Sequence, residues 1–328
     1  MKRYLALAAL LAVLDSYAEA QTARPADKSP HEVQFVAVDK DVKLEVLDWG
    51  GSGQPLIFLP GLGATAHDFD KFALRFTARH HVYGITRRGF GASDKPKPTI
   101  SNYAADRLGD DVLAVMRTLK IVRPVLAGHS IAGGELSSVA SRHPEKLSGV
   151  VYLDAAYVYA FYNAGIMPLH LNLTVNDMRT RVNKLSQSDA PPALVKAEVD
   201  QLFETNLPQL ETDLRLTRRF LGSSDTPSNR LLDPESAILA GVQKFGSVKL
   251  PVLAIYALPK KILPGASAAE RADKLAHDVI DGKTADLFAA GNPKAEVVRV
   301  GNSAHDVFSS NPLEVGQEMD AFMAGLPH

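Results

Sequence analysis

One serine in this chain stands where a nucleophile could act. The stretch VLAGHSIAGGEL, residues 125–136, is a short apolar run that reaches Ser130 among small residues and then continues as a helical pattern. A serine hydroxyl is a weak nucleophile until a neighbouring base accepts its proton, and a tight strand-to-helix turn exposes it for that chemistry. The amides that begin the following helix could also hold an oxyanion. The structural alternative is a serine that only caps this helix.

A base is available late in the chain. His305, in VRVGNSAHDVF, follows the last apolar run, at the edge of a parallel sheet where α/β folds keep their sites. His129 adjoins the serine and should point away from it, so we interpret it as structural. The other histidines after residue 130 have other interpretations. His143 lies at a predicted helix end and His277 on a helix face, whereas His170 falls in the helical insertion and His328 is the C-terminal residue.

The elements that must position these residues alternate along the chain. A predicted hairpin, 33–39 and 42–49, is followed by six short apolar runs bounded by Gly and Pro, with helical patterns between them, including 101–119 and 311–324. Short runs in which apolar and polar residues do not alternate are typical of strands buried on both faces. The pattern predicts an α/β fold with a mostly parallel sheet. The six runs are 56–59, 81–86, 124–128, 149–154, 251–257 and 295–300.

One long interval contains no strand pattern. Residues 155–247 include amphipathic helical segments such as 192–221. Because long structureless loops are rare in compact domains, we predict a helical cap there, inserted between the sixth and seventh strands. The core would then comprise 31–154 and 248–328. The alternative is that these helices thicken the core layer.

Four motifs in order resemble the α/β-hydrolase superfamily, specifically its cap-bearing branch, over about residues 33–325. They are FLPGLGATAHDF, TRRGFGASDKP, the turn around Ser130, and GNSAHDVF. The resemblance implies an eight-stranded, mostly parallel sheet flanked by helices, with Ser130 as nucleophile and His305 as general base. It also implies an oxyanion hole formed by the backbone N–H groups of Ile131 and Leu62.

The sequence departs from this family at three places. Ala132 replaces the second glycine of G-x-S-x-G, a small change. Pro60 replaces the usual histidine before the oxyanion glycine, which removes a supporting contact. The segment after the seventh strand, IYALPKKILPG, supplies no carboxylate before Glu270, although the family usually places its acid there.

The acid must therefore come from another strand end, because it has to fix the tautomer of the histidine. Asp154 ends the run VVYLD, beside the strand of the nucleophile in the sheet order that the resemblance implies, and it keeps the order serine, acid, histidine. The alternative is that Asp154 caps a helix or holds a loop. Asp306 should point away from its neighbour, and Glu270, Asp273 and Asp278 lie too far along a helix.

The identity of the nucleophile narrows the chemistry. Epoxide hydrolases and haloalkane dehalogenases of this superfamily use aspartate at this turn, so a serine favours acyl transfer through an acyl-enzyme. We expect a small-molecule ester substrate. Amides, N-terminal proline peptides, lactones, carbon-carbon bonds and perhydrolysis with the same triad stay open, as does a non-catalytic binding protein on the same fold.

The composition excludes several other classes. The chain has 328 residues and a formal net charge of −1, without basic clusters, which argues against nucleic-acid binding. His67, Asp68 and Asp70 lack a convincing metal spacing, and no phosphate-loop or dinucleotide fingerprint occurs, so we predict neither metal nor cofactor. Nothing in the sequence predicts the oligomeric state.

The N-terminus predicts export. Residues 1–20 carry two basic residues, an apolar stretch and a small-x-small site, as in a signal peptide cleaved after Ala20. The apolar stretch is short for a membrane anchor, so none should remain after cleavage. Residues 21–30 resemble a disordered spacer. The chain contains no cysteine, which excludes disulfides and lipid attachment through one, and fits a periplasmic or extracellular bacterial protein.

Overall fold

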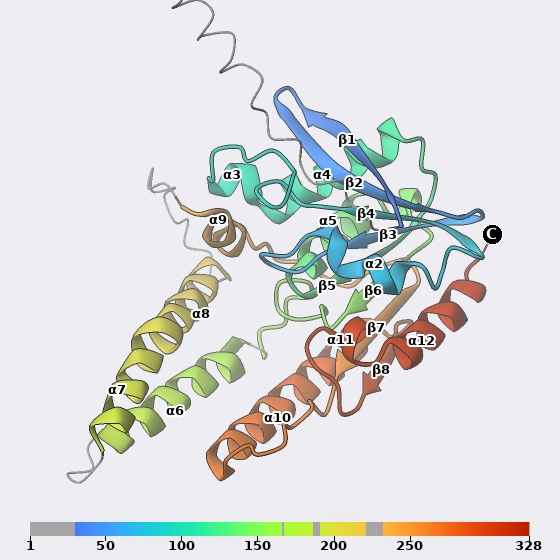
Figure 1. Cartoon of the computed structure of the whole chain (residues 1–328). Coiled ribbons are helices and arrows are strands. Elements are labelled where there is room, and N and C mark those ends of the chain that lie inside the picture. Colours follow the sequence, from blue (N-terminus) through green and yellow to red (C-terminus); the bar gives the residue numbers. More distant parts are fainter. Residues whose placement is uncertain (1–29, 166, 186–190, 221–231, 328) are drawn as a thin grey trace, which may run out of the picture. The chain divides into compact units, whose positions relative to one another are not determined.

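The core of the protein is one eight-stranded sheet with the order β1-β2-β4-β3-β5-β6-β7-β8 (Figure 1). The first two pairings are antiparallel and the other five are parallel. This confirms the predicted fold class, including the leading hairpin. The strands are β1 (Glu32–Asp39), β2 (Val42–Gly50), β3 (Gln54–Leu59), β4 (His80–Ile85), β5 (Val125–His129), β6 (Gly149–Leu153), β7 (Val252–Ala257) and β8 (Glu296–Val300).

The computed structural model describes residues 30–165, 167–185, 191–220 and 232–327. The predicted signal peptide, 1–20, and all of the predicted spacer except Pro30 lie outside the described residues. His31–His328 form one compact unit.

Helices cover both faces of the sheet, and each face has its own apolar core. One core contains inward-facing residues of α4, α5 and α10. The other contains aromatic and aliphatic residues of η1, α2, α11 and α12. Burial on both faces explains why the central strands are continuous apolar runs in the sequence. The flanking helices are η1 (Ala66–Phe69), α2 (Asp70–Ala73), α3 (Ile100–Tyr103), α4 (Ala105–Thr118), η2 (Ser130–Ala132), α5 (Gly133–Arg142), η3 (Pro144–Lys146), α10 (Ala268–Gly291), α11 (Val307–Ser310) and α12 (Pro312–Ala324).

Where it is described, the interval between β6 and β7 consists of helices joined to the sheet by the irregular segments 154–165 and 241–251. It contains α6 (Met167–Leu185), α7 (Pro192–Gln201), η4 (Leu202–Asn206), α8 (Leu207–Phe220) and α9 (Pro234–Ala240). Of the predicted amphipathic segment 192–221, residues 192–220 form α7 and α8, joined by the π-helical turn η4, and residue 221 lies outside the described residues.

The two ends of this interval pack on the main domain. Phe161 is buried in the core shared with α4, α5 and α10. Ile238 and Val242, in and just after α9, cluster with Ile131. The predicted boundaries 155 and 247 therefore include residues that belong structurally to the core, because apolar side chains at each end of an insertion must be buried somewhere.

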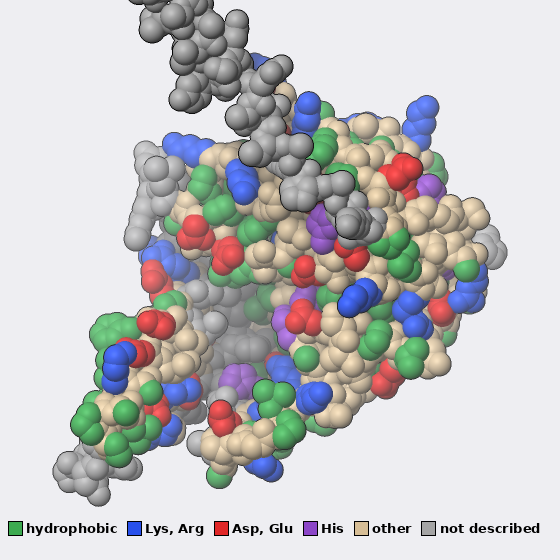
Figure 2. All heavy atoms as spheres, viewed as in Figure 1, with side chains coloured by type: hydrophobic (Ala, Val, Ile, Leu, Met, Phe, Trp, Pro, Cys, Tyr) green, Lys and Arg blue, Asp and Glu red, His purple; other side chains and the backbone are tan. Residues whose placement is uncertain are grey.

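Charged side chains of both signs are interspersed on the face shown in Figure 2. Among the described helices, none combines the length and the apolar character needed to cross a membrane.

Candidate active site

The turn after β5 holds Ser130 in a strained conformation. Ser130 has φ +52°, a left-handed value that L-residues adopt rarely, and it begins the single turn η2 that leads into α5. The helix can start so close to the sheet because Gly133 has no side chain. A Cβ atom at Gly133 would overlap the carbonyl oxygen of Ala155. These constraints fix Ser130 at the carboxyl end of the strand.

The structure brings the three predicted catalytic residues into one hydrogen-bonded chain. His305 Nε2 lies 2.8 Å from Ser130 Oγ, and His305 Nδ1 lies 2.7 Å from Asp154 Oδ2. Because a carboxylate only accepts, Nδ1 carries the proton in this arrangement, and Nε2 accepts the hydrogen bond from the serine hydroxyl. This is the geometry that a serine needs for proton transfer to a base.

The register of the sheet explains why Asp154 takes this position. His129 of β5 pairs with Leu153 of β6, so the residues that follow, Ser130 and Asp154, leave adjacent strands at the same level. Asp154 also has a left-handed backbone, with φ +46°, and its N–H donates to the carbonyl oxygen of Ile255 on β7 at 2.7 Å. Both side chains are therefore presented at the same edge of the sheet.

Asp154 is fully buried and remains ionised through its hydrogen bonds. Its Oδ1 accepts from the Tyr157 hydroxyl at 2.7 Å and from the Ala257 N–H at 3.1 Å. Burial alone would raise the pKa of Asp154, but the hydrogen bond and charge of His305, together with these two donors, hold that pKa below its usual value. The carboxylate can therefore stabilise a protonated His305.

His129 lies beside the site, contrary to the expectation that it points away. Its ring centroid is 4.6 Å from that of His305, and its Nε2 donates to the His305 carbonyl oxygen at 3.1 Å. Burial and the neighbouring His305 lower the pKa of His129 to about 4. The hydrogen bond of His129 holds the loop that carries His305.

An open cleft of about 650 Å³ lies over Ser130, within the range of small-molecule sites. Its wall includes the predicted oxyanion residue Leu62 and the acidic pair Asp68 and Asp306. Desolvation and the adjacent Asp306 raise the pKa of Asp68. The other predicted oxyanion donor, the N–H of Ile131, belongs to the turn that follows the serine.

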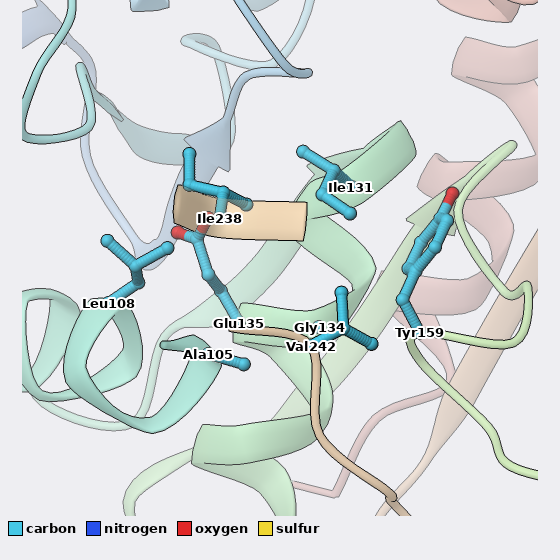
Figure 3. Close-up of a pocket in the computed structure, with 8 residues that line it drawn as sticks. All are labelled: Ala105, Leu108, Ile131, Gly134, Glu135, Tyr159, Ile238 and Val242. Carbon is cyan, nitrogen blue, oxygen red and sulfur yellow. The ribbon is translucent and has the colours of Figure 1, made fainter. Parts of the chain in front are cut away.

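Tyr159 is a site residue whose individual role the sequence did not reveal. Its side chain lies close enough to Ser130 to interact with it, and burial raises the pKa of Tyr159 well above the usual tyrosine value, so the hydroxyl stays protonated. Tyr159 also closes a small apolar cavity of about 10 Å³ beneath Ile131 and beside Ile238 (Figure 3). That volume corresponds to about one water molecule, so the cavity is no substrate pocket.

The aromatic segment that begins the insertion contributes side chains both to the site and to the core. The Tyr157 hydroxyl donates to Asp154 and Phe161 packs in the core, whereas Tyr159 lies close to Ser130. The clue in the sequence was three aromatic residues in the seven positions after Asp154, but the conformation of the loop decides which of them face the core and which face the site.

The other acidic candidates lie away from His305. Glu270 completes a capping box with Ser267 at the start of α10, and Asp278 of the same helix accepts from the Lys260 N–H. Asp306 is largely exposed, and its Oδ1 lies 3.6 Å from His129 Nε2. The nitrogen of His305 that contacts an acid, Nδ1, contacts Asp154 instead. The side chain of Asp273 is outside the described residues.

Two of the metal-like residues of the sequence, His67 and Asp70, form a polar cluster with His31, whereas Asp68 lines the cleft over Ser130. His31, His67 and Asp70 place ligand-type atoms within 4.8 Å of one another. Asp70 Oδ1 lies 2.7 Å from His31 Nδ1 and accepts from Trp49 Nε1 at 2.9 Å. These contacts use Asp70 as a hydrogen-bond acceptor that ties residue 31 to the core.

The fold and this arrangement define a class of protein: a mostly parallel sheet covered by helices on both faces, with a serine after β5, an acid after β6 and a histidine after β8. A family model described as the alpha/beta hydrolase fold matches residues 54–312. The chain belongs to the α/β-hydrolase fold family.

Relatives of known name match parts of the chain. A 2-(acetamidomethylene)succinate hydrolase of Mesorhizobium japonicum is 30% identical over 104 residues, 32% of this chain and 36% of the relative. An sn-1-specific diacylglycerol lipase of Xenopus tropicalis is 28% identical over 193 residues, 56% of this chain and 57% of the relative. The chain thus spans between about a third and three fifths of the length of these two relatives.

Solved structures share the fold at low identity. A crystal structure of E-2-(acetamidomethylene)succinate hydrolase gives a TM-score of 0.54 at 21% identity and covers 90% of this chain and 100% of its own. A proline iminopeptidase-related protein of Thermus thermophilus gives 0.59 at 16% identity, covering 90% of this chain and 98% of its own.

Proposed function

We propose that this protein is a serine hydrolase that cleaves a carboxylic ester through an acyl-enzyme on Ser130. The observation that carries the proposal is the continuous chain from Ser130 Oγ through the His305 ring to Asp154, with distances of 2.8 and 2.7 Å. The membership of the α/β-hydrolase fold family supports it.

The chemistry follows from the direction of each hydrogen bond. As Ser130 Oγ attacks the ester carbonyl carbon, its proton passes to His305 Nε2, and Asp154 stabilises the resulting imidazolium. The carbonyl oxygen becomes an oxyanion, which the N–H groups of Leu62 and Ile131 would bind. His305 then protonates the leaving alcohol. In the second half, His305 accepts a proton from the water that attacks the acyl-enzyme, and then returns it to Ser130 Oγ as the bond from Oγ to the acyl carbon breaks and the acid is released.

The names of relatives give the range of substrates to test. They include a diacylglycerol lipase, a 3-oxoadipate enol-lactonase and a bifunctional esterase/perhydrolase. Amide, lactone, carbon-carbon and peroxide chemistry could each use the same three side chains, and a non-catalytic binding protein is the alternative of another class. We also propose that the helices between β6 and β7 act as a cap that selects the acyl group.

The test is hydrolysis of p-nitrophenyl esters from acetate to palmitate by the mature protein, beside Ser130→Ala. The proposal predicts turnover of at least one chain length, loss of that turnover in Ser130→Ala, and labelling of Ser130 by a fluorophosphonate. Unlabelled Ser130 together with equal activity of the two proteins would contradict it and favour the binding protein.

Export is a further part of the proposal. The basic and apolar residues of 1–20 support it. N-terminal sequencing of protein recovered from the periplasm or the medium should begin at Gln21. Recovery of the full-length chain only from the cytoplasm would contradict export without affecting the proposed chemistry.

A further inference from the structure

We propose that Arg87 is a positioning residue that fixes the peptide between Gly61 and Leu62 and thereby aims the Leu62 N–H at the oxyanion. This inference rests on the proposed function. Arg87 lies two residues beyond the end of β4. Its side chain is almost completely buried between α5 and the segment 60–62, which we call the oxyanion loop.

The guanidinium of Arg87 makes three hydrogen bonds. Nη1 donates to the carbonyl oxygen of Gly61 at 3.0 Å, and Nη2 donates to that of Pro60 at 2.8 Å. Nε donates to Glu135 Oε1 at 2.5 Å. Because the guanidinium is planar and rigid, three simultaneous contacts fix the positions of all three acceptors relative to one another.

The bond to Gly61 determines where Leu62 can donate. The carbonyl of Gly61 and the N–H of Leu62 belong to one planar trans peptide, in which they point in opposite directions. A donor that holds this carbonyl therefore also sets the direction of the Leu62 N–H. A hydrogen bond at the carbonyl end also polarises the amide, which strengthens its N–H as a donor.

Glu135 connects this support to the nucleophile. It lies five residues after Ser130 in the chain, on α5, and is buried. A buried carboxylate has to be paired, and Arg87 is its partner. The helix that begins behind Ser130 and the loop that carries Leu62 are thus held by one ion pair, so the distance between attacking oxygen and oxyanion donor is set by a rigid connection.

This contact compensates for a departure noted in the sequence. The family usually has a histidine where this chain has Pro60, and proline offers no side-chain polar group to brace the loop. In this protein the hydrogen bonds that hold the loop come from Arg87, which lies outside the loop and contacts one side of it. His129 Nδ1 lies on another side, where a Cβ atom on Gly61 would come within 2.8 Å of it.

The neighbouring Arg88 provides a matched control. It is also fully buried, and its Nε and Nη2 donate to Asp111 of α4 at 2.6 and 2.5 Å. Arg87→Lys and Arg88→Lys therefore make the same chemical change at adjacent buried positions, but only the first removes the planar fork from the oxyanion loop.

The experiment compares both variants with wild type in ester hydrolysis, thermal unfolding and inhibition by an alkyl boronic acid. The boron adds to Ser130 Oγ and gives an anionic tetrahedral adduct that needs the oxyanion donors. For Arg87→Lys we expect kcat to fall about 10- to 100-fold with KM nearly unchanged, because loss of one oxyanion donor costs about 100- to 1,000-fold and lysine retains part of the support. Boronate affinity should fall by a similar factor.

Arg88→Lys should be destabilised but keep kcat and boronate affinity near the wild-type values. Equal losses of kcat in the two lysine variants, or a loss in KM alone for Arg87→Lys, would overturn the inference while leaving the proposed function intact. If Arg87→Lys does not fold, Glu135→Gln must show a smaller loss of kcat and boronate affinity in the same direction. A wild type that binds no boronate and is not labelled at Ser130 refutes both the proposed function and this inference.

Discussion

Acid should destabilise this protein through His129, and the effect can be calculated. Burial and repulsion by His305 lower the pKa of His129 from 6.5 to about 4. Between those values the unfolded chain binds a proton at this residue and the folded protein does not. Stability therefore rises with pH across this window and is lost as the pH falls below 6.5.

The size of the effect follows from the same two values. At about 1.4 kcal/mol per pH unit, the full difference corresponds to about 3 kcal/mol, of which about 2 kcal/mol is lost between pH 7 and pH 5. That is a large part of the stability of a typical domain. Replacing His129 by glutamine removes the titrating group, although the lost packing lowers stability at every pH.

Urea unfolding of wild type and His129→Gln at pH 7 and pH 5 measures the prediction. Wild type should lose about 2 kcal/mol more than the variant on going from pH 7 to pH 5, with unchanged slopes against urea. His143→Gln, at the half-buried C-cap of α5, is the control and should follow wild type. The reasoning is refuted if His129→Gln and wild type lose the same free energy of unfolding over this interval.

Three other outcomes test separate parts of the structure. Asp154→Asn should lower kcat by about 10,000-fold, because an amide cannot hold the productive tautomer of His305, and a loss below tenfold would place the acid elsewhere. In urea unfolding, Gly133→Ala should reduce the free energy of unfolding by about 1–3 kcal/mol, because the new methyl group overlaps the carbonyl oxygen of Ala155. Gly134→Ala should be neutral or stabilising by up to about 1 kcal/mol, because the nearest atom to its methyl group would be 3.4 Å away. Dialysis against EDTA should leave ester hydrolysis unchanged, and activity restored only by an added divalent ion would disprove the expectation of metal-free chemistry.

Much of the sheet could be predicted because its signals are local. The apolar runs that became β3 to β7 are short, bounded by Gly and Pro, and buried almost throughout, so pattern and burial agree, whereas the edge strand β8 is fully buried only at Val300. The serine turn was equally visible, since Gly133 and the small residue Ala132 are required by the close approach of helix and sheet.

The hydrogen bonds that hold the loops around the site could not be predicted, because they join side chains that are distant in the sequence. Arg87 and Glu135 are 48 residues apart, and each is an ordinary charged residue in the sequence. Their pairing depends on how β4 and α5 are placed around the oxyanion loop. The orientation of His129 likewise depends on the loop that carries His305, which no local pattern specifies.

The sequence alone determined the family, the α/β architecture and the identities of Ser130, His305 and Asp154 as candidates, because glycine spacing, apolar period and motif order are properties of neighbouring residues. Only the tertiary structure decided that Asp154 meets His305, through the pairing of His129 with Leu153 in the sheet. It alone also decided that an arginine holds the oxyanion loop. Contacts between strand ends depend on register and packing, which arise only when the whole chain has folded.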